Sequence, residues 1–149
     1  MIDAKDGREA QFEAMMEALS SLQAKYRGVR GALLDSRAPN PSVETLLHAF
    51  LPHRFVDHSH ADAILSVTNR PSGIERVRDA LGDRVATLPY VMPGFPLALA
   101  VKALYQSSPG VVGVVLEKHG LFTFGDSAKE SYERHIELCD AAERWVARV

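Results

Sequence analysis

The chain has 149 residues, of which 46% are hydrophobic and 24% charged, and its formal net charge is −2. This length suits one domain with a real core, and the composition is ordinary for a soluble globular protein. The near-neutral charge provides no basic stripe for nucleic acid. No apolar run could span a bilayer, and the N-terminus is not a signal peptide. The single cysteine, Cys139, excludes an internal disulfide, so we expect a cytoplasmic protein without nucleic-acid or membrane partners.

Hydrophobic spacing and turn residues predict helices and strands that alternate along the chain. A first helix is predicted over about residues 6–26, ended by the glycines within 27–31 and followed by a turn-rich segment at 35–41. The other predicted helices are 44–51, 61–68, 72–81, 97–107 and 128 to the C-terminus, and the predicted strands are 55–60, 83–88, 111–116 and 121–124. This order indicates an α/β layered fold in one domain over residues 1–149. The patterns do not distinguish a parallel from an antiparallel sheet.

Two histidines in the strand predicted at 55–60 form an H-S-H pattern, His58 and His60. Residues i and i+2 of a strand point to the same side, so both imidazoles could bind one ion. A third histidine, His119, follows the Val-rich strand predicted at 111–116. Three neutral imidazoles with one open position are typical of a catalytic divalent metal, usually zinc. The alternative is that these are polar residues at strand ends with ordinary hydrogen bonds.

The glycine after His119, Gly120, permits a sharp turn or a close approach of the backbone to a ligand. Glu44 precedes the histidines, in the stretch P-S-V-E-T-L-L-H. From the residues alone, Glu44 is an acid near a helix start, with Ser42 as a reasonable N-cap.

Four ordered segments together resemble the class II aldolase/adducin family: P-S-V-E-T-L-L-H-A-F-L-P, V-D-H-S-H-A-D-A-I-L, Y-V-M-P-G-F-P-L-A and E-K-H-G-L-F-T-F-G-D-S. The chain looks most similar to the aldolase part of bifunctional rhamnulose-1-phosphate aldolase/dehydrogenases, which also place P-G-F between the H-x-H and the H-G. The resemblance covers about residues 37–149, and residues 1–34 are predicted to form an N-terminal helix and turn.

The resemblance implies a role for each matching residue. His58, His60 and His119 match the family's metal ligands, and Glu44 matches its acid/base carboxylate. It also implies an α/β/α sandwich around a mostly antiparallel sheet, and a Zn²⁺ or another divalent cation as cofactor. The implied activity is cleavage of a small ketose 1-phosphate to dihydroxyacetone phosphate and an aldehyde. The family's subunits commonly form cyclic tetramers, so a homo-oligomer is expected.

One departure from the family concerns the region before Glu44. About forty residues precede it, and they contain no Gly-rich loop of the kind with which the family's aldolases hold the substrate phosphate. The sequence also contains no G-x-G-x-x-G, so binding of NAD is not expected. Two alternatives to the lyase therefore stay open. One is a sibling epimerase or dehydratase on a sugar phosphate, and the other is a truncated or non-catalytic metal-binding domain.

Several further residues have interpretations of their own. His48 could orient Glu44 or a metal ligand, or be a half-buried hydrogen-bonded histidine. His53 and His135 lie in no motif and are expected on the surface. The last helix is expected to bury one apolar face, with the members Tyr132, Ile136, Cys139, Ala142, Trp145 and Val146.

Overall fold

A computed structural model of the chain describes residues 27–149, so the helix predicted over about residues 6–26 lies outside the described residues. The chain divides into two compact units, Met1–Thr45 and Leu46–Val149. In the first unit, residues 27–31 are helical and the helix ends in a turn at Ala32, close to the predicted stop. Turns and bends follow at 34–38, as predicted for this link.

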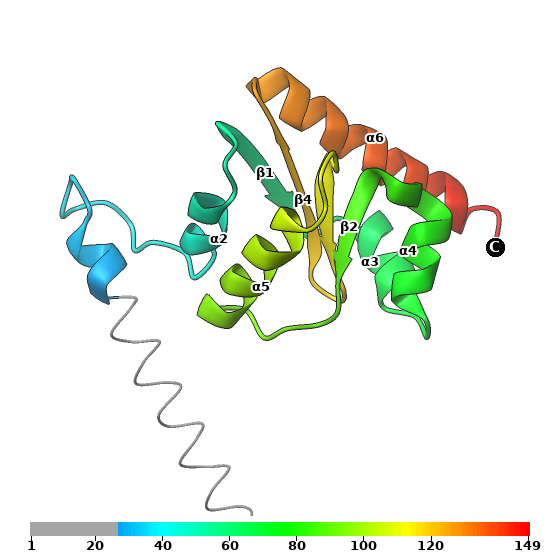
Figure 1. The fold of residues 1–149 in the computed structure, drawn as a ribbon, viewed down its shortest axis with the longest axis horizontal. Coiled ribbons are helices and arrows are strands. Elements are labelled where there is room, and N and C mark those ends of the chain that lie inside the picture. Colours follow the sequence, from blue (N-terminus) through cyan, green and yellow to red (C-terminus); the bar gives the residue numbers. More distant parts are fainter. Residues whose placement is uncertain (1–26) are drawn as a thin grey trace, which may run out of the picture. The chain divides into compact units, whose positions relative to one another are not determined.

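The second unit is built on a mixed sheet (Figure 1). Among the described residues it has four strands: β1 (Phe55–Ser59), β2 (Val85–Leu88), β3 (Gly113–Leu116) and β4 (Gly120–Gly125). Their order is β1-β4-β3-β2. β4 pairs antiparallel with both β1 and β3, whereas β2 and β3 are parallel. The expectation of a mostly antiparallel sheet is therefore confirmed.

Helices cover both faces of this sheet, because the side chains of its strands alternate between two apolar cores (Figure 1). In β4, Phe122 and Phe124 face the core that includes α2 (Thr45–Phe50) and α5 (Phe95–Gln106). Leu121 faces the opposite core, and the helices packed there are α3 (Asp62–Thr68), α4 (Gly73–Leu81) and α6 (Ala128–Val146). These layers are the predicted α/β/α sandwich.

The ends of α4 and α6 lie close to the predicted helix ends. Gly82, at φ 64°, ends α4 as predicted, and a 3-10 turn over Gly82–Arg84 delays the start of β2. Ser127 caps α6, where its side chain accepts the Glu130 N–H. Ser72 precedes the first residue of α4 but makes no side-chain cap hydrogen bond there.

The buried face of α6 was predicted wrongly in its first half. Tyr132 and Ile136 are 61% and 51% exposed. The fully or almost fully buried residues are instead Ser131, His135, Leu138 and Ala142. Their spacings of four, three and four residues make one helical stripe. Hydropathy does not predict this stripe because two of its members, Ser131 and His135, are polar. The expectation that His135 lies on the surface is also wrong.

Candidate metal centre

The three histidines of the two sequence motifs lie together at one end of the β1–β4 pair. His58 is in β1, His60 follows its last residue, and His119 immediately precedes β4. Their ring centroids are 4.8 Å (His58–His60), 5.3 Å (His58–His119) and 5.0 Å (His60–His119) apart. One ring nitrogen from each histidine lies within 4.8 Å of the corresponding nitrogens of the other two. Nitrogens bound to one tetrahedral zinc ion lie about 3.4 Å apart, so the three imidazoles would move closer together on sharing an ion.

Strand pairing produces this convergence from positions far apart in the sequence. β1 and β4 run antiparallel with Ser59 opposite Leu121, so the end of β1 meets the start of β4. A tight turn joins β3 to β4, in which the His119 N–H donates to the Leu116 carbonyl oxygen at 3.1 Å. Lys118, within this turn, has the left-handed φ of 58° that non-glycine residues seldom adopt. The turn thereby brings His119 back beside the H-S-H segment.

Gly120 is required by a close approach of β4 to the end of β1. A Cβ atom added there would lie 2.4 Å from the Ser59 carbonyl oxygen. The same atom would lie 3.2 Å from a ring carbon of His58 and 3.1 Å from one of His60. Any side chain at this position would therefore push the β1 backbone and two imidazoles away from β4.

A hydrogen bond and a ring contact orient His58. Its Nδ1 donates to the Leu121 carbonyl oxygen at 3.0 Å, and its ring stacks on Phe122 at 3.9 Å between centroids. Because a carbonyl oxygen only accepts, Nδ1 carries the proton, and a neutral ring then presents the lone pair of Nε2. This backbone contact is the kind that fixes the tautomer of metal-binding histidines. His58 Nε2 is shielded from solvent, whereas His60 is exposed. This donor set fits a divalent cation.

Glu44 belongs to the first unit, and its part in the chemistry stays a prediction. It directly precedes α2, and its N–H donates to Ser42 Oγ at 3.1 Å. The Thr45 N–H donates to the Ser42 carbonyl oxygen, also at 3.1 Å. Ser42 is therefore a cap at this helix start, as the sequence predicted.

Two other histidines, His48 and His53, have packing roles. His48 is half-buried, and its ring meets Phe122 edge to face at 5.4 Å. Phe122 thus contacts both His48 and His58. His53 is partly buried rather than on the surface: it stacks on Phe124 and shares a 2.8 Å hydrogen bond with the Tyr105 hydroxyl. Burial lowers the pKa of His53 below its usual value.

A polar cluster that no sequence motif predicts lies between β1, β4 and α6. His135 of α6 forms hydrogen bonds with Ser59 Oγ, at 2.6 Å, and with Thr123 Oγ1, at 2.9 Å. Burial lowers the pKa of His135, and the nearby Asp57 carboxylate opposes this shift. Ser59 and Asp57 alternate with His58 in β1, so they face α6 while His58 faces the other core. The sequence signal for the burial of His135 is its spacing from Leu138 and Ala142, which places all three on one side of the helix.

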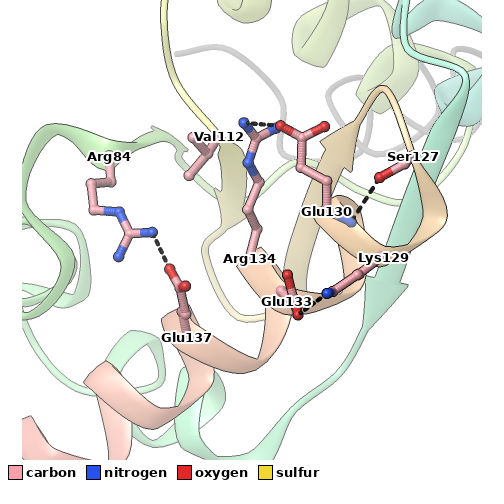
Figure 2. Close-up of a pocket in the computed structure, with 8 residues that line it drawn as sticks. All are labelled: Arg84, Val112, Ser127, Lys129, Glu130, Glu133, Arg134 and Glu137. Atoms are coloured by element: carbon pink, nitrogen blue, oxygen red, sulfur yellow. Dashed lines mark hydrogen bonds and ion pairs between the residues drawn. The ribbon is translucent and has the colours of Figure 1, made fainter.

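A separate groove of about 560 Å³ lies along α6, and none of the three histidines lines it (Figure 2). Its basic side chains are already engaged by acids. Arg84 pairs with Glu137 at 2.7 Å. Arg134 pairs with Glu130 at 2.6 Å, and Lys129 lies 3.6 Å from Glu133. This groove offers no surplus positive charge for an anionic substrate, so it does not compete with the histidine cluster as the candidate site.

Within residues 27–149, no helix is both long and apolar enough to cross a membrane. Residues 10–146 of the chain match the family described as "Class II Aldolase and Adducin N-terminal domain".

Two solved structures share this fold. The N-terminal class II aldolase domain of a conserved protein from Thermoplasma acidophilum is 47% identical, with a TM-score of 0.76, over 83% of this chain and 57% of that one. An aldolase II superfamily protein from Pseudomonas syringae has a TM-score of 0.60 at 19% identity, over 77% of this chain and 50% of that one, which shows a likeness of fold alone.

A curated relative from Bacillus subtilis (strain 168), the uncharacterized oxidoreductase YuxG, is 40% identical over 114 residues. That match covers 76% of this chain but 16% of the relative. The chain thus spans a small part of this relative and about half the length of the two solved structures.

Proposed function

The chain belongs to the class II aldolase/adducin family, and from this premise we propose that it is a metal-dependent lyase. The proposed reaction cleaves a small ketose 1-phosphate, similar to rhamnulose 1-phosphate, into dihydroxyacetone phosphate and an aldehyde. The observation that carries the proposal is the convergence of His58, His60 and His119, with ring nitrogens within 4.8 Å of one another.

In this proposal the three histidines hold the ion and leave at least one coordination position for substrate oxygen atoms. A bound divalent cation supplies Lewis-acid stabilisation of the negative charge that develops on the substrate's carbonyl oxygen. His58 is held by the Leu121 carbonyl, so its Nε2 is oriented before any ion binds. His60 is the solvent-exposed member of the set, so the approach for substrate lies on its side.

Glu44 is the proposed acid/base in this scheme. Its assignment rests on the P-S-V-E-T-L-L-H stretch, in which it occupies the position of the family's carboxylate. A carboxylate there can move the proton on the carbon or oxygen next to the bond that breaks. The Ser42 cap uses the backbone N–H of Glu44 and therefore leaves this role of the side chain open.

Zinc is the proposed ion because a site of three imidazoles is typical of catalytic zinc. Imidazole sites also accept several other first-row metals in the usual order of affinity, so the ion in the cell depends on availability. The substrate is proposed from the P-G-F segment at residues 93–95, which lies between the H-x-H and the H-G as in the rhamnulose-phosphate enzymes. The proposed compartment is the cytoplasm, and nicotinamide is not part of the proposal.

The proposal is tested by measuring the metal content of the purified chain together with aldol cleavage of rhamnulose and fuculose 1-phosphates. We expect about one divalent ion per chain and release of dihydroxyacetone phosphate. The matched control is His60→Ala, which should lose the ion and the cleavage together. One ion without cleavage would support a metal-binding domain without this activity. No ion, even after reconstitution with zinc, would overturn the proposal.

We also propose that the chain forms a homo-oligomer, with the outer face of α6 as one contact. Tyr132 and Ile136 lie one turn apart on this helix and are 61% and 51% exposed. Large apolar side chains grouped on one exposed helix face are typical of surfaces that bind another protein. A tetramer would agree with the family resemblance.

A further inference from the structure

Ser59 stands between the two proposed ligands of the H-S-H segment and points to the opposite face of the sheet. The alternation of a strand requires this arrangement. His58 stacks on Phe122, which lies in the core on the side of α2 and α5. Ser59 Oγ instead meets His135 Nε2 of α6 at 2.6 Å. Ser59, which lies between the two histidines in the sequence, is therefore hydrogen-bonded to α6 on the other side of the sheet.

The hydrogen bonds around His135 have a single direction. Thr123 Oγ1 donates its proton to the Ser131 carbonyl oxygen at 3.1 Å. The same oxygen must then accept at its 2.9 Å contact with His135, so His135 Nδ1 carries the proton. In the neutral ring Nε2 is an acceptor, and the Ser59 hydroxyl donates to it. Ser59, His135 and Thr123 thus each donate to the next group in one chain of hydrogen bonds that ends at the Ser131 carbonyl oxygen.

Three members of this chain are shielded from water, whereas Ser59 is partly buried. Thr123 and Ser131 are fully buried, and His135 is 9% exposed. A second hydrogen bond, from Ser131 Oγ to the Thr123 carbonyl oxygen at 3.3 Å, ties the same turn of α6 to β4. Buried polar groups in such a network lose hydrogen bonds if they rotate, since water does not replace the missing partner.

The backbone of Ser59 is restrained as well. Its carbonyl oxygen lies 2.4 Å from the position that a Cβ atom on Gly120 would take, so the backbones of the two strands are in close contact there. The hydroxyl and the carbonyl of Ser59 are thus both in fixed contacts. His58 and His60 flank Ser59 directly, and in the extended β1 backbone the His58 side chain leaves on the face opposite to that of Ser59. A fixed Ser59 therefore limits how far the backbone that carries both imidazoles can shift.

We propose that His135 is a positioning residue for the metal site, which acts through the Ser59 hydroxyl to hold the His58–Ser59–His60 segment in the conformation that brings its imidazoles together. The inference rests on the proposed function, since it takes the three histidines to bind a divalent cation. His135 and Ser59 touch neither the ion nor the substrate. Their effect is on the arrangement of the ligands and therefore on affinity for the ion.

The test separates this role from a merely structural one by measuring two quantities for each variant. The Kd for Zn²⁺ is measured by competition with a chromogenic chelator, and urea unfolding is measured with the metal removed by EDTA. Ser59→Ala and His135→Phe both break the Ser59–His135 bond, and we expect each to raise the Kd for Zn²⁺ about tenfold, the lower end for residues that orient metal ligands. Ser59→Thr keeps a hydroxyl and should bind within about twofold of the wild type. The visible spectrum of bound Co²⁺ should change in the first two variants only.

The matched control is Tyr105→Phe, which removes the hydrogen bond between the Tyr105 hydroxyl and His53. That bond also involves a partly buried histidine, near the opposite end of β1. We expect Tyr105→Phe to lower the midpoint of urea unfolding without changing the Kd for Zn²⁺. If His135→Phe does not fold, Ser59→Ala alone decides the result.

Zn²⁺ affinities of folded Ser59→Ala and His135→Phe that stay within about twofold of the wild type would overturn the inference and leave the proposed function standing. A rise in Kd that Tyr105→Phe reproduces at an equal loss of stability would overturn it too. Absence of Zn²⁺ binding by the wild type would overturn the proposed function, and this inference with it.

Discussion

Gly120 and Ser59 are packed so closely that a Cβ atom on Gly120 would lie 2.4 Å from the Ser59 carbonyl oxygen. This contact joins the start of β4 to the end of β1, and the three histidines surround it. The proposed metal site is therefore formed where two antiparallel strands are in backbone contact, and its geometry depends on the absence of a side chain at residue 120.

Replacing Gly120 by alanine should damage the site and the fold together. The added carbon must displace the Ser59 carbonyl or the His58 and His60 rings, and overpacking of this kind costs about 1–3 kcal/mol of unfolding free energy. We expect a loss of that size in urea unfolding of the metal-free protein. Because two ligands move, Zn²⁺ affinity should fall at least tenfold, as measured by chelator competition.

The control for this variant is Gly82→Ala. Gly82 also has a positive φ, of 64°, but a Cβ atom there meets nothing within 4 Å. Alanine at this helix end should cost about 1–3 kcal/mol through backbone strain alone and leave Zn²⁺ affinity unchanged. Equal loss of affinity in both variants would show that instability, rather than the contact with Ser59, governs metal binding.

His60 is the ligand whose removal should affect metal binding most cleanly. It is exposed and follows the last residue of β1, so His60→Ala should change the unfolding free energy by no more than about 0.5 kcal/mol. His58→Ala should cost more, because it removes the stacking on Phe122 and the bond to the Leu121 carbonyl. Both variants should lose stoichiometric zinc in titration calorimetry. Full retention of zinc by either would remove that residue from the ligand set.

Much of this site could be predicted from the sequence because its signals are local. The spacing of His58 and His60 predicts a shared side of a strand, and the glycine after His119 predicts a close backbone approach. Both follow from the period of a strand and the missing side chain of glycine, whatever the rest of the fold does.

The part that could not be predicted depends on partners far apart in the chain. Ser59 and His135 are 76 residues apart, and each looks like an ordinary surface residue until α6 lies against β1. The same cause explains the error on α6. Its polar residues Ser131 and His135 can be buried because both form hydrogen bonds with Thr123. Tyr132 and Ile136 remain exposed. Hydropathy alone predicts the reverse, with the apolar pair buried and the polar pair exposed.

Glu44→Gln tests the proposed acid/base without altering the helix start. The amide keeps the size of the side chain and the backbone N–H that Ser42 accepts, so stability should stay within about 0.5 kcal/mol. We expect retained zinc and a kcat for aldol cleavage lower by about 10²–10⁴-fold, the usual contribution of a general acid or base. Ser42→Ala should show the reverse: kcat should be retained, and the free energy of unfolding should fall by about 1 kcal/mol because the helix cap is lost. An unchanged kcat in Glu44→Gln would reduce Glu44 to a residue of the helix start.

The exposed apolar pair on α6 tests the proposed oligomer. Tyr132→Ser and Ile136→Ser together should lower the molar mass measured by light scattering, because they remove apolar area from the proposed contact. Circular dichroism should stay the same, since both side chains are largely outside the core of the second unit. Lys129→Ser and Glu133→Ser, which break an exposed ion pair on the same helix, serve as the control. A mass unaffected by the first pair would exclude this face as the contact.

The buried imidazole of His135 should make stability depend on pH. Burial lowers its pKa in the folded protein below the ordinary value of 6.5, and the Asp57 carboxylate opposes but does not cancel this shift. As the pH falls below 6.5, the unfolded chain takes up a proton that the folded chain does not, so the free energy of unfolding decreases. The decrease continues until the pH passes the lowered pKa, and above 6.5 this contribution is constant.

His135→Gln should remove that part of the dependence. We expect the difference in unfolding free energy between about pH 7.5 and about pH 5.5, measured in urea with EDTA, to be smaller in the variant than in the wild type. Some dependence should remain, because burial also lowers the pKa of His53. Tyr105→Phe keeps both histidines and should therefore keep most of the wild-type difference. A variant with the full wild-type difference would mean that His135 takes up its proton equally in the folded and unfolded chain, which its two hydrogen-bonded nitrogens and its burial among Ser59, Thr123 and Ser131 argue against.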